Sequence, residues 1–222
     1  MSARDVGSEA GFQYDDAANP HVLREIVGVS RVLDVGCGTG ALGRQLKAAT
    51  PSVVVHGVEA NAGPARVAAG VIDRVVQGTF PEVTSQLDPP YDAVVFADVL
   101  EHMEDPWSAL EATRSIVAPG GLVVASIPNI RYWPVTRALL LRGRFDYTET
   151  GVLDRTHLRF FTRISMLQMF EGAGLTVERH YPIPRLTSRV LTLAERLLSA
   201  EGELKSQQFV LRARFRALKG EG

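Results

Sequence analysis

The chain has 222 residues, a length that fits one medium-sized domain or one domain with a small insertion. Its 24 Lys and Arg nearly balance 25 Asp and Glu, and the formal net charge of −1 argues against non-specific binding to nucleic acid. No apolar run approaches the roughly 18–20 residues that cross a bilayer. Residues 1–16 lack the apolar core of a secretory signal, and the single cysteine, Cys37, excludes an intrachain disulfide. The sequence therefore predicts a cytoplasmic protein with no membrane span and no nucleic-acid partner.

Residues 1–18 are expected to form a flexible leader, and residues 19–222 a single domain. At the start of that domain, Asn19 and Pro20 suit the N-cap and first position of a short helix over residues 21–27. Apolar, β-branched runs then alternate with helical patterns. We expect strands at 31–35, 53–58, 74–76, 91–97 and 122–127, helices at 41–49, 63–70 and 105–117, and a turn at 119–121. Strands that are apolar on both faces and separated by helices imply a parallel sheet covered on two sides, which is a doubly wound α/β fold.

The regular alternation ends after Pro128. Residues 129–162 are rich in arginine and aromatic side chains, and we interpret them as an insertion over the carboxyl edge of the sheet. Thr162 can cap a helix, and the elements expected next are a helix at 163–171, a strand at 175–181, a helix at 186–200 and a last strand at 207–215. This last strand would return like a hairpin to form an antiparallel edge, guarded by the alternating Arg212, Arg214 and Arg216. The complete prediction is a Rossmann-like, mostly parallel seven-stranded sheet with an antiparallel last strand.

A glycine-rich turn follows the first predicted strand, in the segment Val32-Leu33-Asp34-Val35-Gly36-Cys37-Gly38-Thr39-Gly40. Glycines between a strand and a helix let the backbone approach a ligand at the carboxyl edge of the sheet. The turn alone is ambiguous, because Gly36, Gly38 and Ala41 also satisfy a dinucleotide-binding fingerprint. Asp34 would face the ligand, where its carboxylate would repel a pyrophosphate but suit the ammonium and sulfonium groups of S-adenosylmethionine. Asp34 therefore disfavours an NAD-dependent oxidoreductase.

A second carboxylate, Glu59, ends the second predicted strand. At this place in nucleoside-binding α/β folds a carboxylate accepts hydrogen bonds from the ribose hydroxyls, so it supports a nucleoside without discriminating between cofactors. The competing interpretation of the glycine turn is a tight connection with no ligand. That interpretation is disfavoured because the clustered glycines cost helix and strand stability.

Three ordered segments carry a family resemblance. Residues 33–40 resemble the first motif of class I S-adenosylmethionine-dependent methyltransferases, residues 96–106 (FADVLEHMEDP) resemble their fourth-strand motif, and residues 118–121 (APGG) resemble their turn before strand five. The resemblance covers roughly residues 20–180. It implies a methyltransferase domain whose cofactor is S-adenosylmethionine.

The resemblance also implies roles for individual residues. The glycine turn would line the methionine and ribose, and Glu59 would bind the ribose. Ala60 and Asn61 would lie beside the adenine, and Asp98 would lie beside the reactive centre. Many family members carry an acidic residue after the third strand to bind the adenine amine; here the stretch reads Gln77-Gly78-Thr79-Phe80, and Thr79 or a backbone group would substitute. The cofactor-binding residues expected on this basis are Asp34, Gly36, Cys37, Gly38, Gly40, Glu59, Ala60, Thr79, Phe80, Ala97 and Asp98.

Methyl transfer requires in-line alignment of the acceptor and, for a hydroxyl or ammonium, removal of a proton. His102 and His157 are the candidate bases because imidazole titrates near neutral pH. Asp154 lies three residues before His157, and the two are expected to form a carboxylate–imidazole pair. Each histidine also has a purely structural interpretation. His102 would hold its loop in place by hydrogen bonds, and the Asp154–His157 pair would anchor the insertion to the core. A metal site of aspartate and histidine is disfavoured for lack of ligands, so no metal ion is predicted.

Residues 150–162 resemble methyltransferases of sugar, polysaccharide and secondary-metabolite pathways. This resemblance makes O-methylation of a small molecule, with a saccharide or secondary-metabolite hydroxyl as acceptor, the leading hypothesis. N-methylation of an amine or amino sugar and a non-catalytic nucleoside-binding regulatory module are the alternatives. The arginine- and aromatic-rich residues 129–162 would either bind an acidic or sugar-like acceptor or form a solvated lid. The acceptor, the methylated atom and the oligomeric state, a homodimer included, stay open.

Overall fold

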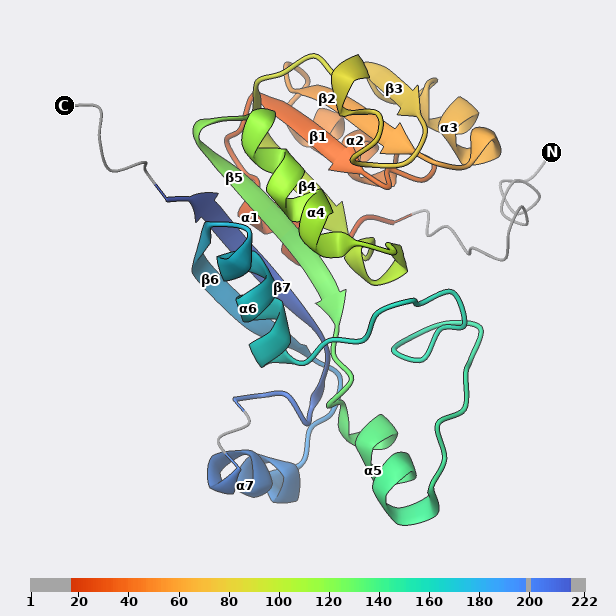
Figure 1. The fold of residues 1–222 in the computed structure, drawn as a ribbon, viewed down its shortest axis with the longest axis vertical. Helices are drawn as coiled ribbons and strands as arrows, with labels where there is room; N and C mark the ends of the chain where they lie inside the picture. Colours follow the sequence, from red (N-terminus) through yellow and green to blue (C-terminus); the bar gives the residue numbers. More distant parts are fainter. Residues whose placement is uncertain (1–16, 199–200, 217–222) are drawn as a thin grey trace.

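A seven-stranded sheet organises the chain, which a computed structural model describes over residues 17–198 and 201–216 (Figure 1). Its strands are β1 (Arg31–Val35), β2 (Val54–Glu59), β3 (Arg74–Gln77), β4 (Tyr91–Ala97), β5 (Val117–Pro128), β6 (Leu175–Pro184) and β7 (Ser206–Phe215). Their spatial order is β3-β2-β1-β4-β5-β7-β6. The first five strands pair in parallel, whereas β7 runs antiparallel to both β5 and β6. The predicted mostly parallel sheet with an antiparallel last strand is therefore confirmed.

Helices fill the connections between the strands. They are α1 (Pro20–Glu25), α2 (Ala41–Ala49), α3 (Ala62–Ala68), α4 (Pro106–Ala112), α5 (Trp133–Arg142), α6 (Arg163–Gly172) and α7 (Arg189–Leu197), with short 3-10 turns η3 (Thr84–Gln86), η4 (Leu100–His102) and η5 (Thr113–Ser115). The side chain of Asn19 accepts from the backbone N–H of His21 at the start of α1, as predicted. Thr162 forms a capping box with Ser165 at the start of α6. Both N-termini are thus set by local sequence.

Two apolar cores cover the two faces of the sheet. On one face, Val94 and Phe96 of β4 belong to the same buried cluster as Phe170 of α6 and Leu110 of α4. On the other face, Val95 packs in a cluster that includes side chains next to α1 and within α2, Ile26 and Leu42. Successive residues of a strand point to opposite faces, so a strand covered on both sides is apolar throughout. This is why the β-branched runs predicted the strands well.

The predicted turn at residues 119–121 lies inside β5 instead of before it. Tyr91 pairs with Val117 and Ala93 pairs with Leu122, so the strand bulges between these two pairs. Gly120, with φ of 72°, sits within the bulge. The strand is longer than predicted because pairing with β4 resumes upstream of the glycines.

The predicted edge position of the last strand is wrong. β7 lies between β5 and β6, and β6 forms the edge of the sheet. Its arginines are paired with neighbouring elements: Arg212 Nη1 lies 3.8 Å from Glu25 Oε2 at the end of α1, and Arg214 Nε lies 2.9 Å from Glu178 Oε1 on β6. The alternating charges reflect these ion pairs and not an exposed edge.

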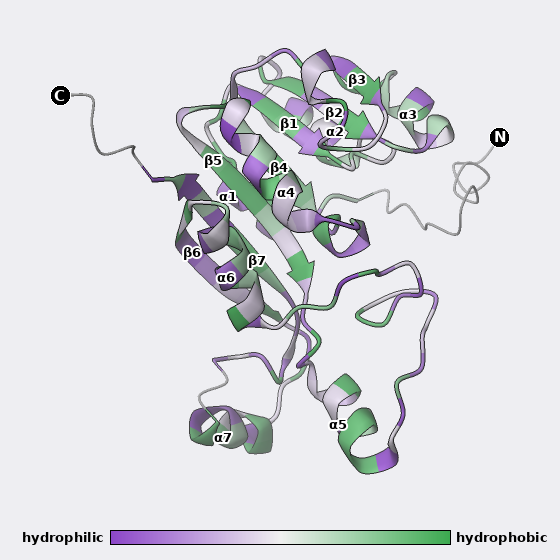
Figure 2. Cartoon of the chain, in the orientation of Figure 1, coloured by the Kyte–Doolittle hydropathy of each residue, from purple (hydrophilic) through white to green (hydrophobic). Residues whose placement is uncertain are grey.

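Residues 129–162 leave the sheet after β5 and return to it before α6. An isolated bridge joins Asn129 to Phe161, so the two ends of this segment lie side by side. Between them α5, which the sequence analysis did not predict, begins with a proline in its first turn and ends at Gly143 in the left-handed region, φ 62°. Leu140 and Leu141 of α5 are 76% and 73% exposed, and Figure 2 shows hydrophobic residues on this projecting helix. No helix in the part of the chain that the structure describes is long and apolar enough to span a membrane.

Candidate active site

A cavity of about 1720 Å³ opens at the carboxyl edge of β1, β2 and β4. Its wall combines the turn after β1, the end of β2, the loop after β3, the segment around η4, residues near 150–158 and the start of β7. Every residue predicted for cofactor binding or catalysis except Gly40 lies on this wall. Gly40 is instead the N-cap of α2, with φ of 84°. The predicted residues thus line one common cavity, whereas Gly40 starts the helix.

The turn after β1 is held against the end of β2. The backbone N–H groups of Gly36 and Cys37 donate to Val58 O at 2.8 and 3.0 Å, and Gly38 N–H donates to Glu59 Oε2 at 2.9 Å. Gly36 has φ of 72°, and a Cβ there would lie 2.5 Å from Val99 Cγ2. Only glycine fits at this position without moving the segment that follows β4.

The two carboxylates predicted to bind the cofactor, Asp34 and Glu59, lie on the cavity wall on adjacent strands. Asp34 is 3% exposed, and burial, together with the neighbouring charge of Glu59, raises the pKa of Asp34 to about 8. Glu59 accepts from Gly38 N–H through Oε2 and from Asn61 N–H at 2.9 Å through Oε1. The free protein therefore holds Asp34 largely protonated at neutral pH. A cationic ligand beside Asp34 would favour its ionised form.

The loop after β3 supplies an acidic residue that the sequence analysis missed. Thr79 was expected to substitute for the missing acidic residue, and its hydroxyl donates to the carboxylate of Glu82. Glu82 lies on the cavity wall together with Thr79 and Phe80. Phe80 is buried, and its ring meets that of Phe96 edge-on at a centroid distance of 5.7 Å. Glu82 stands three residues after Thr79 in the sequence, so an acidic residue was present nearby. Only the folded loop, however, shows that Glu82 lies on the cavity wall.

Asp98 is fixed at the end of β4 by two donors from other strands. Ser126 Oγ of β5 donates to Asp98 Oδ2 at 3.0 Å, and the amide of Gln208 on β7 donates to Oδ1. Its backbone has φ of 56°, an uncommon conformation for a residue other than glycine. Such outliers concentrate at functional sites. The role of Gln208 could not be predicted because it depends on β7 lying next to β5.

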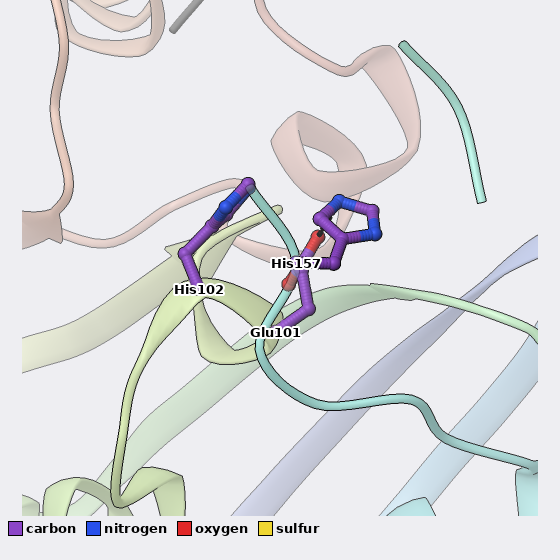
Figure 3. A group of neighbouring side chains, drawn as sticks. All are labelled: Glu101, His102 and His157. Atoms are coloured by element: carbon purple, nitrogen blue, oxygen red, sulfur yellow. Dashed lines mark ion pairs between the residues drawn. The ribbon is translucent and has the colours of Figure 1, made fainter. Parts of the chain in front are cut away.

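Glu101, His102 and His157 form a cluster on the same cavity wall (Figure 3). Glu101 is 1% exposed, and neither of its carboxylate oxygens has a hydrogen-bond partner among the described residues. Burial and the charge of Asp98 raise the pKa of Glu101 well above its usual range. His157 Nε2 lies 4.0 Å from Glu101 Oε1, too far for a hydrogen bond.

Both histidines are oriented by backbone carbonyls through Nδ1. His157 Nδ1 lies 3.0 Å from Val152 O, and His102 Nδ1 lies 3.2 Å from Thr156 O. Their rings meet edge-on with centroids 4.7 Å apart. Burial lowers the pKa of both imidazoles, and for His102 the neighbouring His157 adds to the effect. Both rings are therefore neutral at physiological pH.

The expected pairing of Asp154 with His157 is not formed. Asp154 Oδ1 instead accepts from the backbone N–H of Thr156 at 2.8 Å and from its hydroxyl at 2.6 Å. This is the usual local turn of an aspartate that bonds the backbone two residues on. The carboxylate nearest to His157 in the cluster belongs to Glu101, which the sequence analysis did not select because 56 residues separate the two. Asp154 still lies on the cavity wall.

The sheet order, the glycine turn and the paired carboxylates at the ends of β1 and β2 define a class I S-adenosylmethionine-dependent methyltransferase, as the sequence resemblance implied. A family model for the methyltransferase domain matches residues 13–180, and the chain belongs to that family. The predicted enzyme class and cofactor, S-adenosylmethionine, are thus confirmed.

Among curated proteins, the ubiquinone biosynthesis O-methyltransferase of Aeromonas salmonicida is 34% identical over 155 residues, which cover 66% of this chain and 63% of that protein. That of Pseudomonas savastanoi pv. phaseolicola is 32% identical over 188 residues, covering 76% and 78%. A solved SAM-dependent methyltransferase from Archaeoglobus fulgidus has the same fold, with a TM-score of 0.64 and 18% identity over 87% of this chain and 90% of that one. The match thus spans just under two thirds of the length of the Aeromonas protein.

Proposed function

We propose that the chain transfers the methyl group of S-adenosylmethionine to a hydroxyl oxygen of a small-molecule acceptor. The main support for this proposal is that the wall of one cavity has two chemically different parts. Asp34 and Glu59 offer carboxylates at the cofactor end, and Glu101, His102 and His157 gather at the other part of the wall. The first part suits a cationic nucleoside, and the second suits a group that must lose a proton.

At the cofactor end, the carboxylate of Asp34 attracts the ammonium and sulfonium charges, while Glu59 is placed to accept from the ribose hydroxyls. Each oxygen of Glu59 accepts one backbone N–H, and a carboxylate oxygen can accept more than one hydrogen bond. Glu82, held by Thr79, is the candidate acceptor for the adenine amine.

At the acceptor end, the neutral imidazoles supply the proton acceptor. His102 and His157 both have a lowered pKa through burial, so their free-base forms dominate at neutral pH. The enzyme's main task is to hold the oxygen in line with the methyl carbon and the sulfur, because the sulfonium is already an activated leaving group. Asp98, which accepts from Ser126 and Gln208, lies on the same cavity wall.

The acceptor class has two candidates. The relatives named for ubiquinone biosynthesis favour, for this chain too, a hydroxyl of an intermediate in that synthesis. A saccharide hydroxyl is the second candidate, supported by the resemblance of residues 150–162 to sugar methyltransferases and by the polar Arg185 and Gln207 on the cavity wall. We further propose that residues 129–162 form a lid and that the protein is a cytoplasmic homodimer. Light scattering after gel filtration tests the homodimer.

Mass spectrometry with S-adenosylmethionine carrying a trideuterated methyl group tests the proposed transfer. The protein is incubated with separate pools of phenolic quinone precursors, saccharides and amines. A labelled methyl ether in the phenol or saccharide pool is the expected result, and its fragmentation identifies the methylated oxygen. Labelled N-methyl products alone would overturn the choice of oxygen. Absence of label from every pool, with S-adenosylhomocysteine bound, would favour the non-catalytic module.

A further inference from the structure

Three potential metal ligands converge from segments far apart in the sequence. Glu101 and His102 belong to η4, and His157 follows β5 by about 30 residues. One ligand atom from each side chain lies within 4.8 Å of the other two. In Figure 3 the carboxylate of Glu101 lies between the two imidazole rings. We propose that these three side chains bind a divalent transition-metal ion on the acceptor side of the cavity.

The state of Glu101 is an observation independent of that convergence. A carboxylate that is 1% exposed, with neither oxygen hydrogen-bonded within the described residues, carries an uncompensated cost of burial. The adjacent carboxylate of Asp98 adds further negative charge, and this charge contributes to the raised pKa of Glu101. A cation between Glu101 and the imidazoles removes this cost, and its second charge offsets that of Asp98.

The histidines have the orientation of metal ligands. A carbonyl oxygen can only accept, so Val152 O and Thr156 O place the proton of each ring on Nδ1. The lone pair of each ring is then on Nε2, and His157 Nε2 is the atom that lies 4.0 Å from Glu101 Oε1. Ligating histidines usually donate their other N–H to a carbonyl or carboxylate in this way.

The ligand set selects the ion. Two imidazoles and one carboxylate are the ligands of catalytic zinc sites and of other first-row ions, whereas magnesium prefers oxygen ligands. Bonds of about 2.0–2.2 Å place two ligands of a tetrahedral ion about 3.4 Å apart, so ligand atoms that now lie within 4.8 Å of one another move closer by up to about 1.4 Å when the ion binds. Three protein ligands leave a coordination position facing the cavity. The ion is therefore placed to contact an acceptor hydroxyl.

The role of the site rests on the proposed function. An ion at this place lowers the pKa of an acceptor hydroxyl that it contacts, and the hydroxyl proton passes to solvent. The oxygen lone pair then forms the bond to the methyl carbon, and the electrons of the breaking carbon–sulfur bond stay on sulfur, which gives neutral S-adenosylhomocysteine. No oxidant or reductant takes part.

Direct metal binding by the full chain tests the site without recourse to methyl transfer. Protein stripped with a chelator is titrated with zinc chloride against a chromophoric competitor, and cobalt chloride reports the ligand geometry through its visible absorption. We expect one ion per chain, with affinity reduced at least about 100-fold in Glu101→Gln and in His157→Gln. His180→Gln, on β6 and away from the cavity, is the matched control and keeps the affinity of the unchanged protein.

Melting curves of the stripped proteins show whether both variants fold, and Glu101→Gln removes a buried charge without changing shape. Equal zinc affinity in the unchanged protein and in both folded variants would overturn the proposed site. Full methyl-transfer rate in the chelated protein would overturn the role of the ion while leaving the proposed function intact. Zinc binding lost in the variants supports the site even if no acceptor is methylated, because the titration does not depend on turnover.

Discussion

Asp34 is the residue whose electrostatics bear most directly on cofactor binding. Its carboxyl is buried at the end of β1 with a pKa of about 8, next to the carboxylate of Glu59. In the free protein below pH 8 the group is therefore mostly neutral. The cofactor brings positive charge to this place, and positive charge stabilises the ionised form. Binding of the cofactor and release of a proton are consequently linked.

Calorimetry with S-adenosylhomocysteine, which retains the ammonium group, measures this linkage. Because the bound form of Asp34 has the lower pKa, the affinity is expected to rise with pH, by up to about tenfold per unit, and to level off above about pH 8. Titrations at pH 7 in buffers of different ionisation enthalpy should show close to one proton released. Asp34→Asn should abolish the release and weaken binding. Affinity independent of pH between 6.5 and 8 would contradict the assignment of Asp34.

Gly36 gives a steric test of the same site. An alanine there has an unfavourable φ of 72° and a Cβ 2.5 Å from Val99 Cγ2, so the turn or the segment after β4 must shift. We expect Gly36→Ala to weaken S-adenosylhomocysteine about tenfold or more, since a small displacement near the ligand is costly. Gly172→Ala is the control, because a Cβ at Gly172 meets nothing within 4 Å. If both variants bound S-adenosylhomocysteine with equal affinity, the turn would not contact the cofactor.

At the scale of single elements, the sequence predicted what local rules determine. The strand at Arg31–Val35, the helix at Ala41–Ala49 and the strand at Tyr91–Ala97 have their predicted bounds. Gly36 follows the first strand, Gly40 precedes the helix and Pro90 precedes the second strand, so local breakers mark an end of each. Helix α5 was missed although Pro134 and Gly143 mark its ends. Its apolar residues stay exposed, so they do not form the one-sided pattern by which a packed helix is recognised.

The capping box of α6 is a local feature with a measurable energy. Thr162 Oγ1 accepts from Ser165 N–H, and Ser165 Oγ accepts from Thr162 N–H, so two donors of the first turn are satisfied. We expect Thr162→Ala to lower the free energy of unfolding by about 1 kcal/mol, measured by urea denaturation. Thr50→Ala, an exposed position at the end of α2, should change it by less than about 0.5 kcal/mol. Equal effects of the two substitutions would show that the box contributes nothing.

Pairings between distant segments could not be predicted from the sequence. The place of β7 between β5 and β6 depends on which strands meet, and alternating arginines fit an edge strand as well as the ion pairs with Glu25 and Glu178. The same limit applies to the candidate site. Motif resemblance predicted its cofactor side, whereas the contact between Glu101 and His157 arises only when the segment after β5 folds back onto η4.

At the scale of the whole molecule, the strand order explains where the cavity forms. The order reverses between β1 and β4, since the chain runs outward from β1 through β2 to β3 and then crosses to β4. Connections on either side of this point diverge to opposite faces and leave a crevice at the carboxyl ends of the strands. Asp34 lies one residue before the end of β1, and Asp98 follows β4, the two strands that flank it. The segment after β5 covers the far side and contributes His157 to the wall.

The central claim is that this crevice binds S-adenosylmethionine at the carboxyl ends of β1 and β2. Calorimetric titration of the purified chain with S-adenosylmethionine, S-adenosylhomocysteine and NADH tests it most directly. The account predicts one site with micromolar affinity for both adenosyl ligands, lost in Asp34→Asn, and no binding of NADH. Binding of NADH in place of the adenosyl ligands, or adenosyl binding that is unaffected by Asp34→Asn, would contradict it.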